Sequence, residues 1–265
     1  MTTSRARVTI TAQGVQRHYG SRAKRFAAVD DVSLAIDSTR ALGIVGESGS
    51  GKSTLAKMLV GLEKPTAGTI LLDGQDMTDM ASRTEGMREL RRTVQMVAQD
   101  TSSSFDPRKT LREAVRRPAQ LLRGLSQTDA DAEVDELLAL LDLDPKLTDR
   151  KPGQVSGGQR QRFSLARALV VRPRILVCDE VVSALDVSVQ GTILNFVKDY
   201  CLEHDCGLVF VSHGLPATAF ISDDMIVMYK GKIVENGLAE DVVTAPRHPY
   251  TKSLIEAYST SEQSA

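Results

Sequence analysis

Residues 40–54 read RALGIVGESGSGKST, and this stretch decides the fold. A short apolar run over 40–45 leads directly into Gly-x-x-x-x-Gly-Lys-Ser at 46–53. Such a loop binds phosphate only when a strand precedes it and a helix follows it, because its backbone N–H groups must point inward together. We therefore predict a strand over 40–45, a phosphate-binding loop, and a helix over 52–61. An ordinary glycine turn is the alternative, and the position between strand and helix disfavours it.

Two polar side chains of this loop have specific expected roles. Lys52 is expected to reach the β- and γ-phosphates of a nucleotide, and the Ser53 hydroxyl is expected to ligate Mg²⁺. The residues predicted to contact the nucleotide here are Gly46, Glu47, Ser48, Gly49, Ser50, Gly51, Lys52, Ser53 and Thr54.

A second anion site is predicted downstream, where residues 155–159 read VSGGQ. A serine followed by two glycines and a helix-like stretch over 159–171 would form a helix N-terminus with open backbone N–H groups. Because one triphosphate site already exists at Lys52, this second site suggests that ATP is also held from its other side by a second copy or a partner. The predicted contacts are Ser156, Gly157, Gly158 and Gln159.

Two acids end the apolar run over 175–178. Asp179 is expected to organise the shell of Mg²⁺, and Glu180 is expected to orient or deprotonate the attacking water. Two solvated acids at a strand end are the alternative, which the phosphate loop elsewhere in the chain disfavours.

Bulk properties narrow the class of protein. The chain has 265 residues, of which 42% are hydrophobic and 25% charged, and its net charge is −1. The composition indicates a globular protein, and the net charge near zero gives no indication of a nucleic-acid partner. We find no apolar run of about 18 residues and no signal-peptide core at the start, so we expect a cytosolic chain. Three cysteines in a reducing compartment are expected to be free thiols.

The remaining pattern alternates strands and helices, which predicts a mainly parallel sheet with helices on both faces. A helical block over 109–143 interrupts this alternation, with Thr128 as a candidate N-cap. The predicted strands are 7–12, 31–36, 68–72, 93–98, 174–178, 207–211, 224–229 and 231–235, and the later helices are 188–203 and 215–221. The polar residues 256–265 are expected to be frayed.

Further motifs give a family resemblance that covers nearly the whole chain. Tyr19 in 17–20, Gln99 in 95–100, the SALD stretch at 183–186 and His213 in 211–213 follow the order seen in ATP-binding subunits of ABC transporters, which the chain resembles. The resemblance implies an α/β P-loop NTPase: a mostly parallel sheet core, an antiparallel β subdomain and an inserted helical subdomain. It implies one domain over 1–265, with a helical subdomain at about 100–165 and a short C-terminal tail at 246–265.

The resemblance also implies roles for these residues. Tyr19 would stack on adenine, Gln99 would touch Mg²⁺ and sense membrane subunits, and His213 would contact the γ-phosphate. Residues 183–186 would cross the interface of a head-to-tail dimer. From the residues alone, the alternatives are an edge-strand aromatic for Tyr19, a polar strand end for Gln99 and a core histidine for His213.

The branch of the family is indicated by residues 95–108, 186–190 and 247–251, which resemble importers of peptides or nickel, most of all the second ATPase of nickel systems. Partners implied are a second nucleotide-binding subunit (a paralogue or itself), two integral membrane permease subunits and, indirectly, an extracytoplasmic solute-binding protein. The chain would then sit peripherally on the cytoplasmic face of the cell membrane.

Departures from the family pattern leave the catalytic groups in place. Val155, Ala98, Val181 and Gly214 replace commoner residues, and Gly214 is expected to loosen the loop of His213. We therefore expect an active site that can differ from its dimer mate in turnover. The competing hypotheses are a soluble ABC ATPase acting on ribosomes or DNA, and a small-molecule kinase, which leaves 156–159 unexplained.

Overall fold

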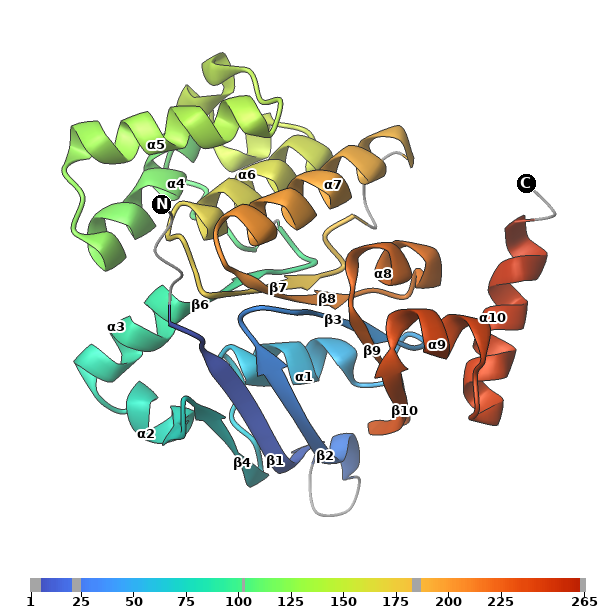
Figure 1. Cartoon of the computed structure of the whole chain (residues 1–265). Helices are drawn as coiled ribbons and strands as arrows, with labels where there is room; N and C mark the ends of the chain where they lie inside the picture. Colours follow the sequence, from blue (N-terminus) through green and yellow to red (C-terminus); the bar gives the residue numbers. More distant parts are fainter. Residues whose placement is uncertain (1–5, 21–24, 102, 183–186, 263–265) are drawn as a thin grey trace. The chain divides into compact units, whose positions relative to one another are not determined.

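The computed structural model describes residues 6–20, 25–101, 103–182 and 187–262 (Figure 1). The chain divides into two compact units. The first unit comprises Met1–Leu90 and Gly207–Ala265, and the second comprises Arg91–Cys206.

The first unit contains an antiparallel sheet with the strand order β2-β1-β4-β5. Its strands are β1 (Thr9–Tyr19), β2 (Phe26–Asp37), β4 (Ala67–Leu72) and β5 (Gln75–Asp76). β1 runs beyond the predicted 7–12 because a bulge between Ala12 and Val15, with Gly14 at φ 56°, lets pairing resume after the alternation breaks. The turn at Asp73 and Gly74 joins β4 to β5 with positive φ at both residues, as a tight hairpin requires.

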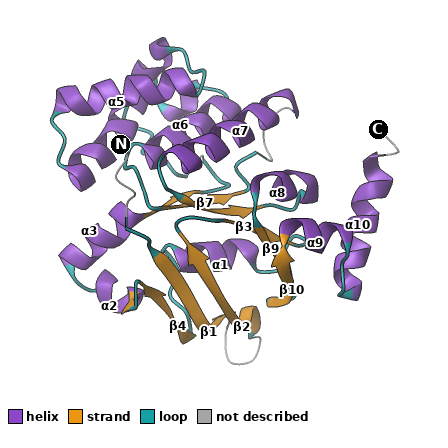
Figure 2. Cartoon of the chain, viewed as in Figure 1, coloured by secondary structure: helices purple, strands orange, loops and turns teal. Residues whose placement is uncertain are grey.

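The phosphate loop belongs to a second group of strands in this unit, in the order β10-β9-β3-β8. β3 (Ala41–Val45) pairs in parallel with β8 (Gly207–Val211) and β9 (Asp224–Tyr229), and β10 (Lys232–Leu238) pairs antiparallel with β9. Four of the five β3 residues are buried, as expected for a parallel strand covered on both faces. The helices of this unit are α1 (Lys52–Leu59), α2 (Met77–Ala81), α8 (Leu215–Ile221), α9 (Ala239–Thr244) and α10 (Pro249–Glu262), with α3 (Thr84–Thr93) leading into the second unit (Figure 2).

The C-terminal segment is more ordered than its polar composition indicates. α10 remains helical to Glu262, so the expected fraying of 256–262 is wrong. The helix lies beside α9 in Figure 1 and packs Leu254, Ile255 and Tyr258 against an apolar cluster of this unit. Burial of one apolar face stabilises a helix whose other residues are polar. The cluster is built on Val45, Leu215, Met225, Val227, Ala239, Val242 and Leu254.

Among its described residues, the second unit carries two parallel strands and four α-helices that follow α3. β6 (Val94–Val97) pairs with β7 (Ile175–Asp179). The helices are α4 (Leu111–Pro118), which runs into a π-helical turn at Ala119–Arg123, α5 (Gln127–Leu140), α6 (Gly157–Leu169) and α7 (Val187–Glu203). The predicted cap at Thr128 is wrong: Ser126 caps α5, because its hydroxyl accepts the Asp129 amide at 3.1 Å.

In the described ranges, no helix has the length and apolarity needed to cross a bilayer. Cys178, Cys201 and Cys206 are free and buried, as predicted, and burial raises the pKa of the Cys178 thiol. Such thiols are inert core side chains.

Candidate nucleotide site

The loop between β3 and α1 has a backbone that requires glycine. Gly46 and Gly51 have φ values of 149° and 106°, in the region that side chains rarely adopt. A Cβ on Gly46 would lie 2.2 Å from the carbonyl oxygen of Met228, and one on Gly51 would lie 2.1 Å from that of Ala28. The loop is therefore pressed against neighbouring backbone on one side, while Glu47, Ser48 and Gly49 are exposed on the other.

Polar groups of the loop converge as an anion site needs. Lys52 is buried, and its Nζ donates to the carbonyl oxygens of Gly46 at 2.7 Å and of Glu47 at 2.9 Å. The buried Ser50 hydroxyl has no hydrogen-bond partner among the described residues. Gly51 precedes α1 and makes no side-chain cap bond, and the start of a helix is where backbone N–H groups bind anions. These donors fit a chain of phosphates.

Tyr19 lies at the end of β1 with 40% of its surface exposed. The Arg17 guanidinium covers one face of the ring, 4.8 Å from the centroid. Arg17 is itself anchored by an ion pair with Glu63 and by donation to the carbonyl oxygen of Lys64 at 3.0 Å. The ring is thus oriented from one side, and its other face is able to receive a flat base by stacking.

His213 follows β8 and is exposed at the start of a tightly held turn. Its carbonyl oxygen accepts a hydrogen bond from the Tyr258 hydroxyl. The next residue, Gly214, donates its N–H to the Ser212 hydroxyl at 2.9 Å and accepts from the Thr218 amide at 3.2 Å. Gly214 therefore does not loosen this loop as expected, because both of its backbone polar groups are anchored. Its φ of −78° is one that any residue adopts.

In the second unit, the parallel register of β6 and β7 brings three predicted residues to one edge. Val97 pairs with Cys178, so the positions that follow the two strands are level. Gln99 leaves β6 and is exposed, whereas Asp179 ends β7 and is only 2% exposed. Glu180 follows with φ at 55°. This conformation is uncommon for a residue other than glycine, and it occurs more often at functional sites than elsewhere.

The second predicted anion site is a helix N-terminus, as expected. Ser156 caps α6 by accepting the Gln159 amide at 3.2 Å, and the Gln159 side chain accepts the Ser156 amide at 3.0 Å. This reciprocal box occupies two donors. The amides of Gly157 and Gly158, at the first helical positions, have no intrahelical acceptor and are the ones available to an anion.

Two arginines of α6 were missed by sequence reasoning. Arg160 donates to the Thr101 hydroxyl at 3.3 Å. Arg167 donates to the carbonyl oxygen of Ser104 and lies 4.4 Å from the centroid of the Phe105 ring. They fix the segment that follows Gln99, and only tertiary contacts reveal this.

The predicted residues form two sets, one in each unit. The first unit carries residues 46–54, Tyr19 and His213, and the second carries Gln99, Asp179, Glu180 and residues 156–159. The predicted interface stretch 183–186 lies outside the described residues.

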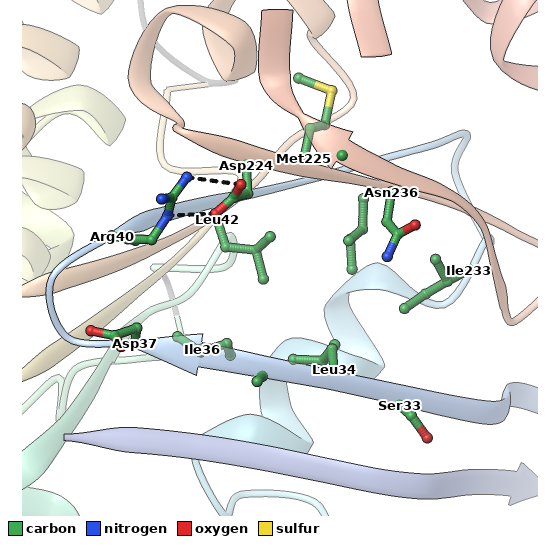
Figure 3. A pocket seen from close by; sticks show the side chains of 13 residues that line it. Ser33, Leu34, Ile36, Asp37, Arg40, Leu42, Asp224, Met225, Ile233 and Asn236 are labelled. Carbon is green, nitrogen blue, oxygen red and sulfur yellow. Dashed lines mark hydrogen bonds and ion pairs between the residues drawn. The ribbon is translucent and has the colours of Figure 1, made fainter. Parts of the chain in front are cut away.

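A cavity of about 260 Å³ in the first unit is separate from these residues (Figure 3). It lies where β2 faces β9 and β10, at the end of β3 away from the phosphate loop, and the ion pair of Arg40 with Asp224 is in its wall. None of the residues that line it belongs to the predicted nucleotide contacts.

Comparison with known proteins relates this geometry to function. The sequence profile described as ABC transporter matches residues 29–183. The oligopeptide transport ATP-binding protein AppF of Bacillus subtilis is 38% identical over 264 residues, covering 97% of this chain and 80% of AppF. The di/tripeptide transport ATP-binding protein DppF of Pseudomonas aeruginosa is 38% identical, covering 94% of this chain and 78% of DppF.

Solved structures agree with the sequence relatives. The ATP-binding cassette MJ0796, in a dimeric post-hydrolysis state bound to ADP and phosphate, superposes with a TM-score of 0.81 at 28% identity. The match covers 87% of this chain and 98% of MJ0796. The predicted P-loop NTPase fold of the ABC type is thereby confirmed.

Proposed function

The chain belongs to the ABC transporter family, and on that premise we propose that it hydrolyses ATP to power an importer of peptides. The observation that carries the proposal is the phosphate loop, in which Lys52 is buried and donates to the Gly46 carbonyl oxygen. The chain is also related to a peptide-transport ATPase over 97% of its length. Sequence motifs alone left peptides, nickel and a related metal chelate open as the transported solute. The names of AppF and DppF support peptides.

ATP would be held between two subunits. The first unit offers a phosphate loop and the second a helix N-terminus with two free amides, at Gly157 and Gly158. The dimeric state of MJ0796 supports a head-to-tail pair, in which the phosphate loop of one copy faces residues 156–159 of the other. The mate is a second copy or a paralogue.

Within that arrangement each of the predicted residues has a defined role. Lys52 would bind the β- and γ-phosphates, and the amides of 46–54 would enclose them. Tyr19, oriented by Arg17, would stack on adenine. His213 would contact the γ-phosphate, in a loop that Tyr258 and Thr218 hold still.

A magnesium site is supported by the chemistry of the donors. Ser53, Asp179 and Gln99 provide hydroxyl, carboxylate and amide oxygens, which are the ligand types that Mg²⁺ prefers. Bound Mg²⁺ neutralises phosphate charge. Glu180 would accept the proton of the attacking water as the terminal phosphate leaves ADP.

Coupling to transport would use the helical segment at about 100–165 and the residues after Gln99. Arg160 and Arg167 tie that segment to α6, so a push on it would be transmitted to residues 156–159. We propose two integral permease subunits as partners, reached from the cytoplasmic face of the membrane, with a solute-binding protein acting on the other side. The single domain over 1–265, with its tail from 246, is the unit that would dock.

The role of Glu180 is tested by Glu180→Gln in the assembled transporter. We expect ATP binding to persist and hydrolysis to fall at least about 100-fold, since a general base contributes this much. Unchanged turnover would exclude Glu180 as the base.

Co-purification tests the partners. We expect the chain to purify with two permease subunits and to leave the membrane fraction when they are deleted. Sedimentation with ribosomes instead would favour a soluble ABC ATPase and contradict the transport proposal.

A further inference from the structure

A side chain of the C-terminal helix contacts the phosphate loop. The backbone N–H of Glu47 donates to the Tyr250 hydroxyl at 2.9 Å. The carbonyl of the same peptide unit, that of Gly46, accepts from Lys52 Nζ at 2.7 Å. One peptide plane is therefore held by Tyr250 at its N–H and by Lys52 at its carbonyl. Any rotation of this plane displaces both partners together.

Packing holds Tyr250 itself in place. Its ring stacks on Tyr229, with centroids 4.2 Å apart and planes inclined by 29°. Tyr229 ends β9, and just beyond it the Gly231 amide donates to the Ser50 carbonyl oxygen at 2.9 Å. The phosphate loop is thus supported by α10 and by the turn after β9. Burial raises the pKa of the Tyr250 hydroxyl above its ordinary value.

The start of α10 is anchored to β10. The Glu235 carboxylate accepts the amides of Arg247 at 2.7 Å and His248 at 3.0 Å. His248 Nδ1 accepts the Tyr250 amide at 3.2 Å, which caps the first turn of the helix. The Arg-His-Pro-Tyr segment, which in the sequence marked only a branch of the family, therefore has a geometric role, since it delivers the Tyr250 hydroxyl to the phosphate loop.

We propose that Tyr250 is a positioning residue for ATP, acting through the Gly46–Glu47 peptide to hold Lys52 ready for the phosphates. The inference rests on the proposed role of Lys52. Loss of the Tyr250 hydroxyl leaves the Glu47 amide without this acceptor and frees the peptide to turn. A net hydrogen bond of ordinary strength corresponds to about 3- to 10-fold in affinity.

The test is Tyr250→Phe in the full chain assembled with its partner subunits, because phenylalanine keeps the stack on Tyr229. We expect the Kd of a fluorescent ATP analogue and the KM for ATP to rise about 3- to 10-fold, with kcat within about twofold. The matched control is Tyr200→Phe, which removes a buried hydroxyl that donates to the Leu169 carbonyl oxygen at 3.0 Å. It should lower the melting temperature and leave KM within about twofold. Equal KM in wild type and Tyr250→Phe would overturn the proposal.

A double-mutant cycle with Lys52→Ala separates positioning from general loosening. If Tyr250 acts through Lys52, Tyr250→Phe changes the Kd of the analogue by less than about twofold once Lys52 is absent. The same loss in both backgrounds would overturn the proposal. Unchanged binding and hydrolysis in Lys52→Ala alone would instead refute the proposed role of Lys52, and the inference with it.

Discussion

Ser156 and Gln159 cap each other at the start of α6: each side chain accepts the backbone amide of the other residue, at 3.2 and 3.0 Å. The pair shapes the helix N-terminus and leaves the amides of Gly157 and Gly158 as the proposed donors for phosphate. The capping motif and the proposed nucleotide contact are therefore the same four residues, and we expect substitution at Ser156 to affect both.

Ser156→Ala should lower stability by about 1 kcal/mol, the usual cost of losing an N-cap. It should also lower the ATPase rate of the assembled transporter, since the helix start that we propose to face the mate's nucleotide loses its shape. Ser126→Ala is the matched control, because Ser126 caps α5 in the same unit by accepting the Asp129 amide. It should cost about the same stability and leave the ATPase rate unchanged. Equal ATPase rates in Ser156→Ala and Ser126→Ala would contradict the proposed contact between Ser156 and the nucleotide.

Gly51→Ala should abolish tight ATP binding. An added Cβ would meet the Ala28 carbonyl oxygen at 2.1 Å, and φ at 106° is strained for alanine, so the loop must deform. Gly74→Ala, at φ 80° with open space around the added Cβ, supplies the control. Left-handed strain alone costs about 1–2 kcal/mol, so this second variant should be less stable and still bind ATP. Calorimetric titration with ATP and thermal denaturation of both proteins distinguish the two effects.

Arg17→Ala should raise the Kd for ATP about 2- to 5-fold, because the guanidinium that orients the Tyr19 ring contributes roughly 0.5–1 kcal/mol. We expect kcat at saturating ATP to be unchanged. The control is Arg40→Ala at the cavity of Figure 3, which also removes one positive charge and breaks an ion pair with a carboxylate, that of Asp224. This variant should leave the Kd for ATP unaltered. A parallel rise in both variants would mean that net charge, and not stacking, sets the affinity.

The contribution of the Glu235 carboxylate to the free energy of unfolding should decrease at acidic pH. Desolvation opposes ionisation of this carboxyl, but hydrogen bonds from the Arg247 and His248 amides help to outweigh it and hold the pKa below its ordinary value of 4.5. A depressed pKa contributes stability that is present above the unfolded-state pKa and is lost as the pH falls through the folded-state pKa. The stability difference between wild type and Glu235→Gln should therefore be largest above about pH 5 and shrink below pH 4.5. Urea denaturation across this range measures it, and a difference that does not change with pH would contradict the assignment.

Motifs with fixed spacing were predictable because the physics that forms them is local. Residues 40–61 predict a strand, a glycine-rich loop and a helix, as the structure has them. Residues 156–159 form a helix start through hydrogen bonds among themselves. Asp179 and Glu180 end an apolar strand, as predicted. These stretches carry their own hydrogen bonds, so the sequence by itself determined the nucleotide-binding elements and the fold class.

Tertiary structure decided what depends on packing between distant segments. The bulge that extends β1 and the ordered helix α10 are stabilised by neighbours that local pattern does not reveal. The contacts of Tyr250 with Glu47 and of Tyr258 with His213 join residues 203 and 45 positions apart. Both contacts depend on which face of α10 is buried. Packing decides that face, and the residues next to Tyr250 and Tyr258 in the sequence do not reveal it. The support behind the phosphate loop is therefore visible only in the folded protein.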